Sequence, residues 1–208
     1  MINLLLVDDD ANWLHALKLY LAADRNFFVM GTAMKHKEAL DFIKFHGHEI
    51  DIVLMDLHLS STKWDGIAVA TEIKPYCDAK IIMLTSFEEE EAVLQSFAVG
   101  AVNFIPKFHY QWLPEAIRTA YYMEGPIQIL VKEYARLKQE EQLMELTPAE
   151  RVIFELIEEG LTQQQIQTKL YKSEKTVKNQ VSAILKKLGV KSSKEAIRKV
   201  RQGGWLQS

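Results

Sequence analysis

The sequence predicts an α/β N-terminal domain, a (βα)5 doubly wound parallel sheet, followed by a C-terminal all-α domain of four helices. Over the first 120 residues or so, five short apolar runs alternate with longer amphipathic segments, a pattern typical of a parallel sheet with helical crossovers. From residue 146 onward the strand signal is replaced by short helices with clear start signals. At 208 residues the chain is also longer than most single domains.

The five apolar runs are the predicted strands, and the later runs are nearly uniform in apolar character. Such uniformity is expected where both faces of a parallel strand are covered by helices. The predicted strands span residues 2–7, 27–31, 52–55, 81–84 and 102–105. The predicted helices between and after them span residues 11–23, 35–46, 66–74, 88–98 and 110–122.

A break follows at Gly125-Pro126, and the next segment carries apolar residues at helical spacing among many charges. We interpret residues 123–145 as a partly helical linker between a domain of residues 1–122 and a domain of residues 146–208. In the second domain, helix starts are predicted from capping-box patterns and helix ends from Gly160 and Gly189. The three patterns are Thr147 with Glu150, Thr162 with Gln165, and Ser192 with Glu195.

The charge of the chain is divided unevenly. Residues 146–208 hold 12 Lys and Arg against 6 Asp and Glu, whereas the preceding residues hold 13 against 22. A basic C-terminal part is expected to meet a polyanion. The opening run, residues 2–7, is too short for a signal peptide, no run could span a bilayer, and Cys77 has no cysteine partner, so we expect a cytoplasmic protein that does not bind membranes.

Polar residues collect at the expected C-terminal ends of four strands, where open parallel sheets bind ligands. They are Asp8-Asp9-Asp10, Asp56, Thr85-Ser86 and Lys107. Converging carboxylates repel each other unless a cation lies among them, and Mg²⁺ is a hard ion that suits oxygen ligands. Asp10 also fits an N-cap, Thr85 a strand end, and Lys107 an ordinary surface cation. The set is therefore more specific than any of its members.

The motifs L-L-L-V-D-D, L-M-D-L, M-L-T-S and G-A-V-N-F-I-P-K resemble the receiver domain of two-component response regulators over residues 1 to about 122. The resemblance implies a flavodoxin-like receiver in which Asp56 accepts a phosphoryl group from a histidine kinase. Asp9 and Asp56 would bind Mg²⁺ directly, Asp8 would bind it through water, and the backbone carbonyl of His58 would supply a further oxygen.

By the same resemblance, Thr85 would donate its hydroxyl to the phosphoryl group, Lys107 would offset its charge, and Phe104 would be the aromatic switch residue. The protein would not be an enzyme beyond assisting its own phosphoryl transfer and dephosphorylation. The loop after the acceptor, residues 56–66, is two residues longer than the family pattern and lacks its proline. This departure puts the loop geometry and the lifetime of the phosphate in doubt.

Residues 173–188 form an amphipathic helix with a basic exposed face. Its apolar stripe comprises Val177, Val181, Ile184, Leu185 and Leu188, and its other face comprises Lys175, Lys178, Asn179, Ser182 and Lys186. Lysines suit phosphates, and asparagine can bind adenine with two hydrogen bonds in the major groove. A basic exposed face is also compatible with simple solvation.

The segment from Leu146 to Trp205 resembles a helix-turn-helix domain of the NarL/LuxR type, on the motifs L-T-P-A-E-R, E-E-G-L-T, I-Q-T-K-L, S-E-K-T-V-K-N-Q-V and K-L-G-V. The resemblance implies double-stranded DNA as a partner, with Lys178, Asn179 and Ser182 facing base edges. Lys172, Ser173, Lys175, Thr176 and Lys186 would contact or approach phosphates. Residues 193–201 would pair protomers in a homodimer formed on phosphorylation or DNA binding.

Three functions are compatible with these features. The first is a transcription factor gated by phosphorylation of Asp56. The second is a DNA-binding regulator that uses its receiver for dimerisation or for another ligand, against which the complete set of phosphorylation residues argues. The third is an aspartate-dependent phosphatase, but Asp8-Asp9-Asp10-Ala11-Asn12 lacks the D-x-D-x-T/V pattern of the dehalogenase type, and a basic helical domain would then have no role.

Overall fold

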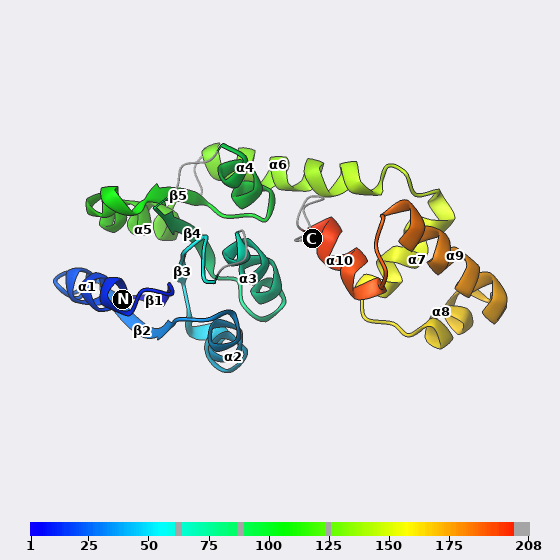
Figure 1. Ribbon diagram of the computed structural model, residues 1–208, viewed down its shortest axis with the longest axis horizontal. Coiled ribbons are helices and arrows are strands. Elements are labelled where there is room, and N and C mark those ends of the chain that lie inside the picture. Colours follow the sequence, from blue (N-terminus) through cyan, green and yellow to red (C-terminus); the bar gives the residue numbers. More distant parts are fainter. Residues whose placement is uncertain (61–63, 87–89, 124–125, 202–208) are drawn as a thin grey trace. The chain divides into compact units, whose positions relative to one another are not determined.

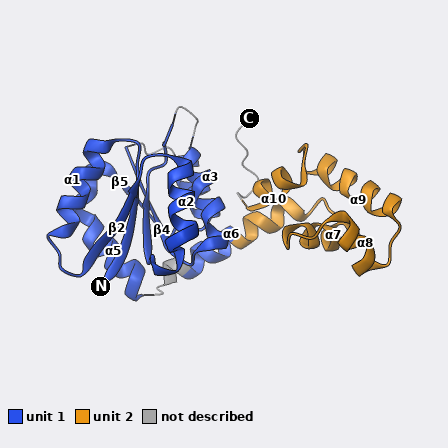
Figure 2. Ribbon diagram, turned by 90° about the horizontal axis from the view of Figure 1, so that it is seen from below, with its two compact units in different colours: residues 1–135, 207 blue, residues 136–206, 208 orange. Residues whose placement is uncertain are grey.

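The computed structural model describes residues 1–60, 64–86, 90–123 and 126–201. The chain divides into two compact units, with the boundary between Ala135 and Arg136 (Figure 2). Unit 1 contains the whole β-sheet, and the part of unit 2 that the structure describes consists of helices and the turns between them (Figure 1). The predicted fold class, an α/β domain followed by an all-α domain, is confirmed.

Unit 1 alternates strands and helices in the predicted order. The strands are β1 (Ile2–Val7), β2 (Phe27–Ala33), β3 (Ile52–Met55), β4 (Lys80–Thr85) and β5 (Asn103–Pro106). The helices are α1 (Ala11–Ala22), α2 (His36–His46), α3 (Asp65–Ile73), α4 (Glu90–Ala98) and α5 (Leu113–Tyr122), with short 3₁₀ segments at Gly47–Glu49, Lys74–Tyr76 and Lys107–Trp112. The segment predicted as a partly helical linker forms α6 (Pro126–Leu143).

The five strands form one parallel sheet in the order β2-β1-β3-β4-β5. The strand order reverses at β1, so the crevice between the C-terminal ends of β1 and β3 is the switch point of the fold. Asp10 caps α1 by accepting hydrogen bonds from the N–H groups of Asn12 and Trp13. This cap directs the chain into a helix immediately after the acidic residues.

Helices cover both faces of the sheet, with α1 and α5 on one face and α2 and α3 on the other (Figure 2). The apolar side chains that face α1 and α5 alternate along each strand, as Leu4 and Leu6 do in β1. Their buried neighbours Leu5 and Val7 point to the opposite face. This double burial explains why the strands read as continuous apolar runs.

Unit 2 contains the end of α6, from Arg136, and the helices α7 (Pro148–Glu158), α8 (Gln163–Leu170), α9 (Glu174–Lys187) and α10 (Ser193–Arg201). Its core contains Leu146, Ile153, Phe154, Leu156, Ile166, Val177, Val181, Ile184, Leu188, Ala196 and Val200. The capping boxes predicted at Thr147 and Thr162 are both formed. The third is formed in part, because Ser192 caps the N–H of Glu195 while the Glu195 carboxylate accepts from Lys191.

One predicted helix starts three residues later in the structure. The helix predicted from residue 110 starts at Leu113, because Lys107–Trp112 forms a 3₁₀ segment first, and Pro114 then lies in the first turn of α5. The predicted break at Gly125 lies outside the described residues, as do residues 61–63 of the long loop, the first two residues of the helix predicted at 88–98, and residues 202–208. None of the described helices is long and apolar enough to cross a membrane.

Candidate functional site

Two carboxylates lie side by side at the switch point of the sheet. Asp56 directly follows β3, and its N–H donates to the carbonyl oxygen of Val7, the last residue of β1, at 2.8 Å. Asp8 follows Val7, and its own N–H donates to the carbonyl oxygen of Ala33 in β2. Both side chains are buried, Asp8 with 3% and Asp56 with 5% of their surface exposed. Strand pairing therefore sets the positions of both carboxylates.

Lys107 bridges these two carboxylates. Its Nζ atom lies 2.6 Å from Asp8 Oδ2 and 2.9 Å from Asp56 Oδ2. The lysine directly follows β5, which is separated from β3 by β4, so its side chain spans the C-terminal end of β4. The predicted convergence of Asp8, Asp56 and Lys107 at one edge of the sheet is present in the structure.

The remaining bonds of Asp56 come from the chain that follows it. Asp56 Oδ1 accepts from the N–H of Leu57 at 2.7 Å, and the carboxylate also accepts from the backbone N–H of His58. The use of the His58 carbonyl as a metal ligand stays a prediction. Gly66 packs closely on the backbone of Asp56. A Cβ atom on residue 66 would lie 1.9 Å from the carbonyl oxygen of Asp56, so only glycine fits at this position.

Asp65 orders the loop after the acceptor. Its Oδ1 atom accepts from the N–H of Leu59 at 2.7 Å, and its Oδ2 atom accepts from the hydroxyl of Ser60. We assigned no role to Asp65 from the sequence, although it lies next to Gly66 within the loop motif. Its carboxylate holds the first part of the lengthened loop against the start of α3.

Burial dominates the electrostatics of the pair. It raises the pKa of Asp8 to about 6, although the hydrogen bond from Lys107 opposes the rise. It also raises the pKa of Asp56, again against the charge of Lys107. Burial by itself would lower the pKa of Lys107, but its bonds to Asp8 and Asp56 outweigh that effect and raise the pKa. One cation thus serves two buried carboxylates, which leaves a net negative charge.

Oxygen atoms of Asp8, Asp9 and Asp56 lie within 4.8 Å of one another. Asp9 is exposed, whereas the other two are buried, so the cluster opens to solvent on one side. An all-oxygen set of three carboxylates with room for water suits Mg²⁺, which keeps several waters and uses one or two carboxylates. The three carboxylates predicted to hold the metal, directly or through water, are therefore close enough to do so.

Thr85 and Phe104 share one face of the sheet. Thr85 is fully buried at the end of β4 and pairs with Pro106, while Met83 pairs with Phe104 in the same register. Residues that pair on adjacent strands project to the same face of the sheet, as do residues two apart on one strand. Phe104, the partner of Met83, therefore projects to the same face as Thr85. This is the face opposite α1 and α5, since Ile82, Leu84 and Ile105 pack against those helices.

An aromatic contact of Lys107 was missed by the sequence analysis. Its Nζ atom lies 5.8 Å from the centroid of the Trp13 ring, and Trp13 contacts Tyr110 edge to face. Because Asp10 caps α1, Trp13 falls in the first turn of that helix, beside the strand ends. The N-cap pattern could therefore have placed Trp13 near the strand ends, whereas its contact with Lys107 depends on the order of the strands.

In unit 2, α9 presents the predicted basic face. Ser173 caps the helix by accepting from the N–H of Thr176, and the stripe led by Val177 and Val181 is buried. All but one of the predicted DNA-contacting residues are exposed, namely Ser173, Lys175, Thr176, Lys178, Asn179, Ser182 and Lys186. The exception is Lys172, which is half buried and donates a hydrogen bond to Gln180 Oε1 at 2.9 Å. The apolar and polar faces of α9 are separated as predicted.

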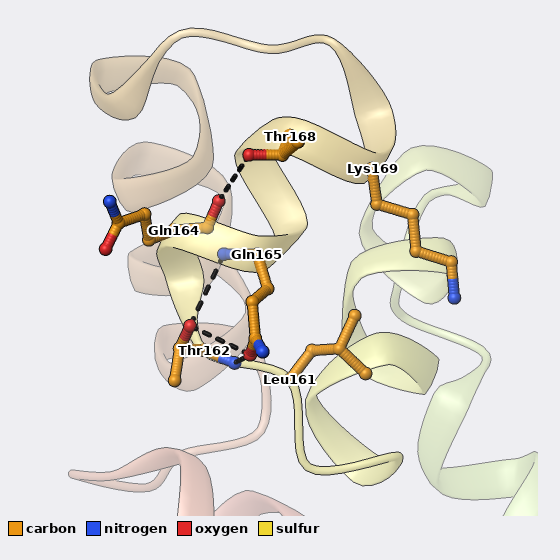
Figure 3. A pocket seen from close by; sticks show the side chains of 6 residues that line it. All are labelled: Leu161, Thr162, Gln164, Gln165, Thr168 and Lys169. Carbon is orange, nitrogen blue, oxygen red and sulfur yellow. Dashed lines mark hydrogen bonds between the residues drawn. The ribbon is translucent and has the colours of Figure 1, made fainter.

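The helix before it, α8, begins at a capping box that Figure 3 shows in detail: Gln165 N–H donates to Thr162 Oγ1, and Thr162 N–H donates to Gln165 Oε1. These residues line a shallow pocket with Leu161, Gln164, Thr168 and Lys169 (Figure 3). Helices α8 and α9 pack against each other, and Ile166 of α8 and Val177 of α9 belong to the same core. The pair is a helix-turn-helix.

Comparison with known proteins covers both units. The family profile of the response regulator receiver domain matches residues 4–118, and that of bacterial regulatory proteins of the luxR family matches residues 144–200. The response regulator protein VraR of Staphylococcus epidermidis is 33% identical over 201 residues, 94% of each chain. The transcriptional regulatory protein YdfI of Bacillus subtilis is 29% identical over 215 residues, 99% of this chain and 98% of that protein.

Solved structures show the same fold. The RcsB response regulator of Salmonella typhimurium aligns over 96% of both chains with a TM-score of 0.53 and 19% identity. A complex of the two-component response regulator RcsB with DNA aligns over 97% of this chain and 98% of that one, with a TM-score of 0.51 and 19% identity.

Proposed function

Because this chain belongs to the response regulators, two-component transcription factors with a receiver domain and a LuxR-type DNA-binding domain, we propose that phosphorylation of Asp56 controls its dimerisation and binding to DNA. The observation that carries the proposal is that Asp56 contacts Lys107 and lies beside the carboxylates of Asp8 and Asp9, which follow β1. The proposed partners are a histidine kinase, a second copy of this chain and double-stranded DNA, all met in the cytoplasm.

In the proposed transfer, a carboxylate oxygen of Asp56 attacks the phosphorus of a phosphohistidine, and the bond from phosphorus to the imidazole nitrogen breaks. The kinase histidine leaves with the electron pair, and an aspartyl phosphate remains. Mg²⁺ held by Asp9 and Asp56, and by Asp8 through water, would offset charge on the phosphoryl oxygens. When the other ring nitrogen of the phosphohistidine carries a proton, the imidazole leaves as a neutral group and needs no proton from this protein, which contributes mainly the positions and charges of these groups. Beyond this transfer and the later hydrolysis, we expect no enzymatic activity.

The side chain of Lys107 is close enough to Asp56 to respond when phosphorylation changes the charge there. In the unphosphorylated protein its Nζ atom pairs with Asp8 and Asp56 together. A phosphoryl group on Asp56 would add negative charge and new acceptor oxygens within reach of the same Nζ atom. We propose that Thr85 adds a hydroxyl from the end of β4, and that Phe104, on the same face of the sheet, shifts with it.

The proposed DNA contacts lie on α9. A recognition helix reaches base edges in the major groove through exposed residues of its N-terminal half, while nearby cations contact phosphates. Lys178 and Asn179 are exposed in the second turn of α9, and Lys175 lies in its first turn. The exposed pair of Lys178 with Glu174, at 3.3 Å, contributes less than about 1 kcal/mol and is readily exchanged for a DNA contact.

Intact-mass measurement tests the chemistry. Wild type, Asp56→Asn and Asp9→Ala are incubated with an acyl phosphate, with and without Mg²⁺. We expect a single phosphoryl adduct on wild type in Mg²⁺ only, a much slower reaction of Asp9→Ala, and no adduct on Asp56→Asn. The exposed Asp41, on α2, provides a control, since Asp41→Asn should react as wild type does. An adduct of undiminished yield on Asp56→Asn would refute the assignment.

A further inference from the structure

Tyr171 lies in the turn between α8 and α9 with a backbone conformation that tyrosine rarely adopts. Its φ of 53° is in the left-handed region, which L-residues with a side chain disfavour. The turn requires this conformation, because the N–H groups of Tyr171 and Lys172 both donate to the carbonyl oxygen of Gln167 at the end of α8. Glycine is the residue that meets this requirement without strain.

The other left-handed positions of unit 2 are glycines. In the described part of the unit, α7 is followed by Gly160 at φ 88° and α9 by Gly189 at φ 64°. The end of α8 is therefore the position at which a strained residue takes the place of glycine. The other non-glycine residue with positive φ among the described residues is Trp64 in unit 1, at φ 56°.

Burial distinguishes these two aromatic residues. Trp64 is 0% exposed, so the apolar area that it buries offsets the strain of its backbone. Tyr171 is 97% exposed, so its ring gains no comparable packing from this chain. The side chain of Tyr171 thus adds strain to the turn without stabilising the folded monomer.

The location of Tyr171 indicates which partner its side chain meets. In a helix-turn-helix the first helix crosses the DNA backbone and the second enters the major groove, so the turn between them lies beside the sugar-phosphate chain. Tyr171 is two residues before Ser173, the N-cap of α9, which places their Cα atoms within about 8 Å. Lys172 and Lys175 add positive charge on either side of that cap, and Lys172 donates to the neutral amide of Gln180.

We propose that Tyr171 is a further DNA-contacting residue, whose phenol O–H donates to a phosphate oxygen at the edge of the major groove occupied by α9. The inference rests on the proposed DNA binding through α9. Tyrosine hydroxyls are established donors to DNA phosphates. Because the phenol is neutral, this contact adds affinity without releasing a counterion, unlike the contact of a lysine.

The test uses the phosphorylated full-length chain and duplexes that the wild type selects from a random-sequence pool. Tyr171→Gly and Tyr171→Asn, which both tolerate positive φ, should lose about tenfold in affinity while the melting temperature stays equal or rises. Tyr171→Phe should lose about threefold or more through the hydroxyl alone. All three should keep the wild-type salt slope, whereas Lys175→Ala should flatten it. Tyr76→Phe, at an exposed tyrosine of unit 1, is the control and should bind as wild type does.

Affinities of the Tyr171 variants within twofold of wild type would overturn the proposal. If Lys178→Ala with Asn179→Ala removes sequence preference in the same assay, DNA binding through α9 stands and only the role of Tyr171 fails. If the melting temperature falls together with the affinity in all three variants, Tyr171 stabilises the fold and the proposed DNA contact is refuted. If the wild type selects no sequence, both the proposed function and this inference fail.

Discussion

Lys107 and Asp8 form an ion pair of 2.6 Å, shorter than the 2.9 Å contact of the same lysine with the acceptor Asp56. The lysine that would meet the phosphoryl group is thus shared with a carboxylate that is not phosphorylated. Asp8 is buried, and its pKa remains raised to about 6 even with this partner. The unphosphorylated site therefore holds two buried carboxylates against one cation. Removing the charge of one carboxylate should stabilise the folded protein.

The first prediction concerns pH and Asp8. With a pKa of about 6 in the folded protein against an ordinary 3.8, the folded state binds a proton more tightly, so stability decreases as pH rises from about 4 to about 6. Asp8→Asn should remove this loss and raise the free energy of unfolding by about 1 to 3 kcal/mol at pH 7.5. The gain should shrink as pH falls through 6 and vanish below about 4.

Urea unfolding at several pH values, in EDTA to exclude divalent ions, measures this effect. The exposed neighbour provides the matched control, since Asp9→Asn should change the free energy of unfolding much less. A variant Asp8→Asn that is less stable than wild type at pH 7.5 would show that the ion pair with Lys107 outweighs the penalty of burial.

The second prediction concerns the metal. Mg²⁺ at about ten times its dissociation constant should raise the free energy of unfolding of wild type by about 1.4 kcal/mol, because it binds the folded carboxylate cluster only. Asp9→Ala should lose most of this gain, and Asp41→Ala, on α2, should keep it. Thermal unfolding across a Mg²⁺ titration decides the matter, and equal stabilisation of wild type and Asp9→Ala would exclude Asp9 as a ligand.

The third prediction separates two kinds of DNA contact on α9. Asn179→Ala should relax base preference at one position of the site, at a loss of about 1 to 3 kcal/mol. Lys175→Ala should weaken binding to every sequence alike and lower the salt slope by about 1. Lys18→Ala, an exposed lysine on α1, controls for a change of net charge. Unchanged sequence preference in a variant lacking both Lys178 and Asn179 side chains would refute the recognition-helix assignment.

Much of this account could be predicted from the sequence because burial on both sheet faces leaves a simple pattern. Strands β1 and β3 were predicted to the residue, since β3 is wholly apolar and β1 is apolar except for Asn3. The end of β2 was missed because Thr32 and Ala33, which pair with Leu6 and Val7, carry no strong apolar signal. Strand order then brings Asp8, Asp56 and Lys107 together, as the motif positions imply.

Other features depend on contacts that no local pattern reveals. The sharing of Lys107 between two carboxylates follows from the distance between strand ends, and the sequence offered Asp8 only as a metal residue. The left-handed conformation of Tyr171 has no composition signal, because the expected residue there is glycine. Contacts between side chains far apart in the sequence, such as Trp13 with Lys107, likewise arise from the fold.

The fourth prediction concerns transmission from the phosphate. Thr85→Ala should leave Asp56 phosphorylatable but lower the gain in DNA affinity that phosphorylation produces, while Thr85→Ser should keep it. Moving a two-state receiver from 1:99 to 99:1 needs about 5.5 kcal/mol, and one charge-assisted hydrogen bond supplies about 1.5 to 3 kcal/mol. Thr85 is thus one contributor among several. A full affinity gain in phosphorylated Thr85→Ala would exclude its hydroxyl from the coupling.

The most direct test of phosphorylation control measures oligomeric state and DNA affinity on the same preparations. Wild type and Asp56→Asn, each treated with an acyl phosphate and Mg²⁺ or left untreated, are examined by sedimentation and by titration with selected duplexes. We predict that treated wild type alone forms dimers and gains affinity, because a dimer that engages two half-sites binds better than either monomer. Identical sedimentation and identical affinity of phosphorylated and unphosphorylated wild type would contradict the account.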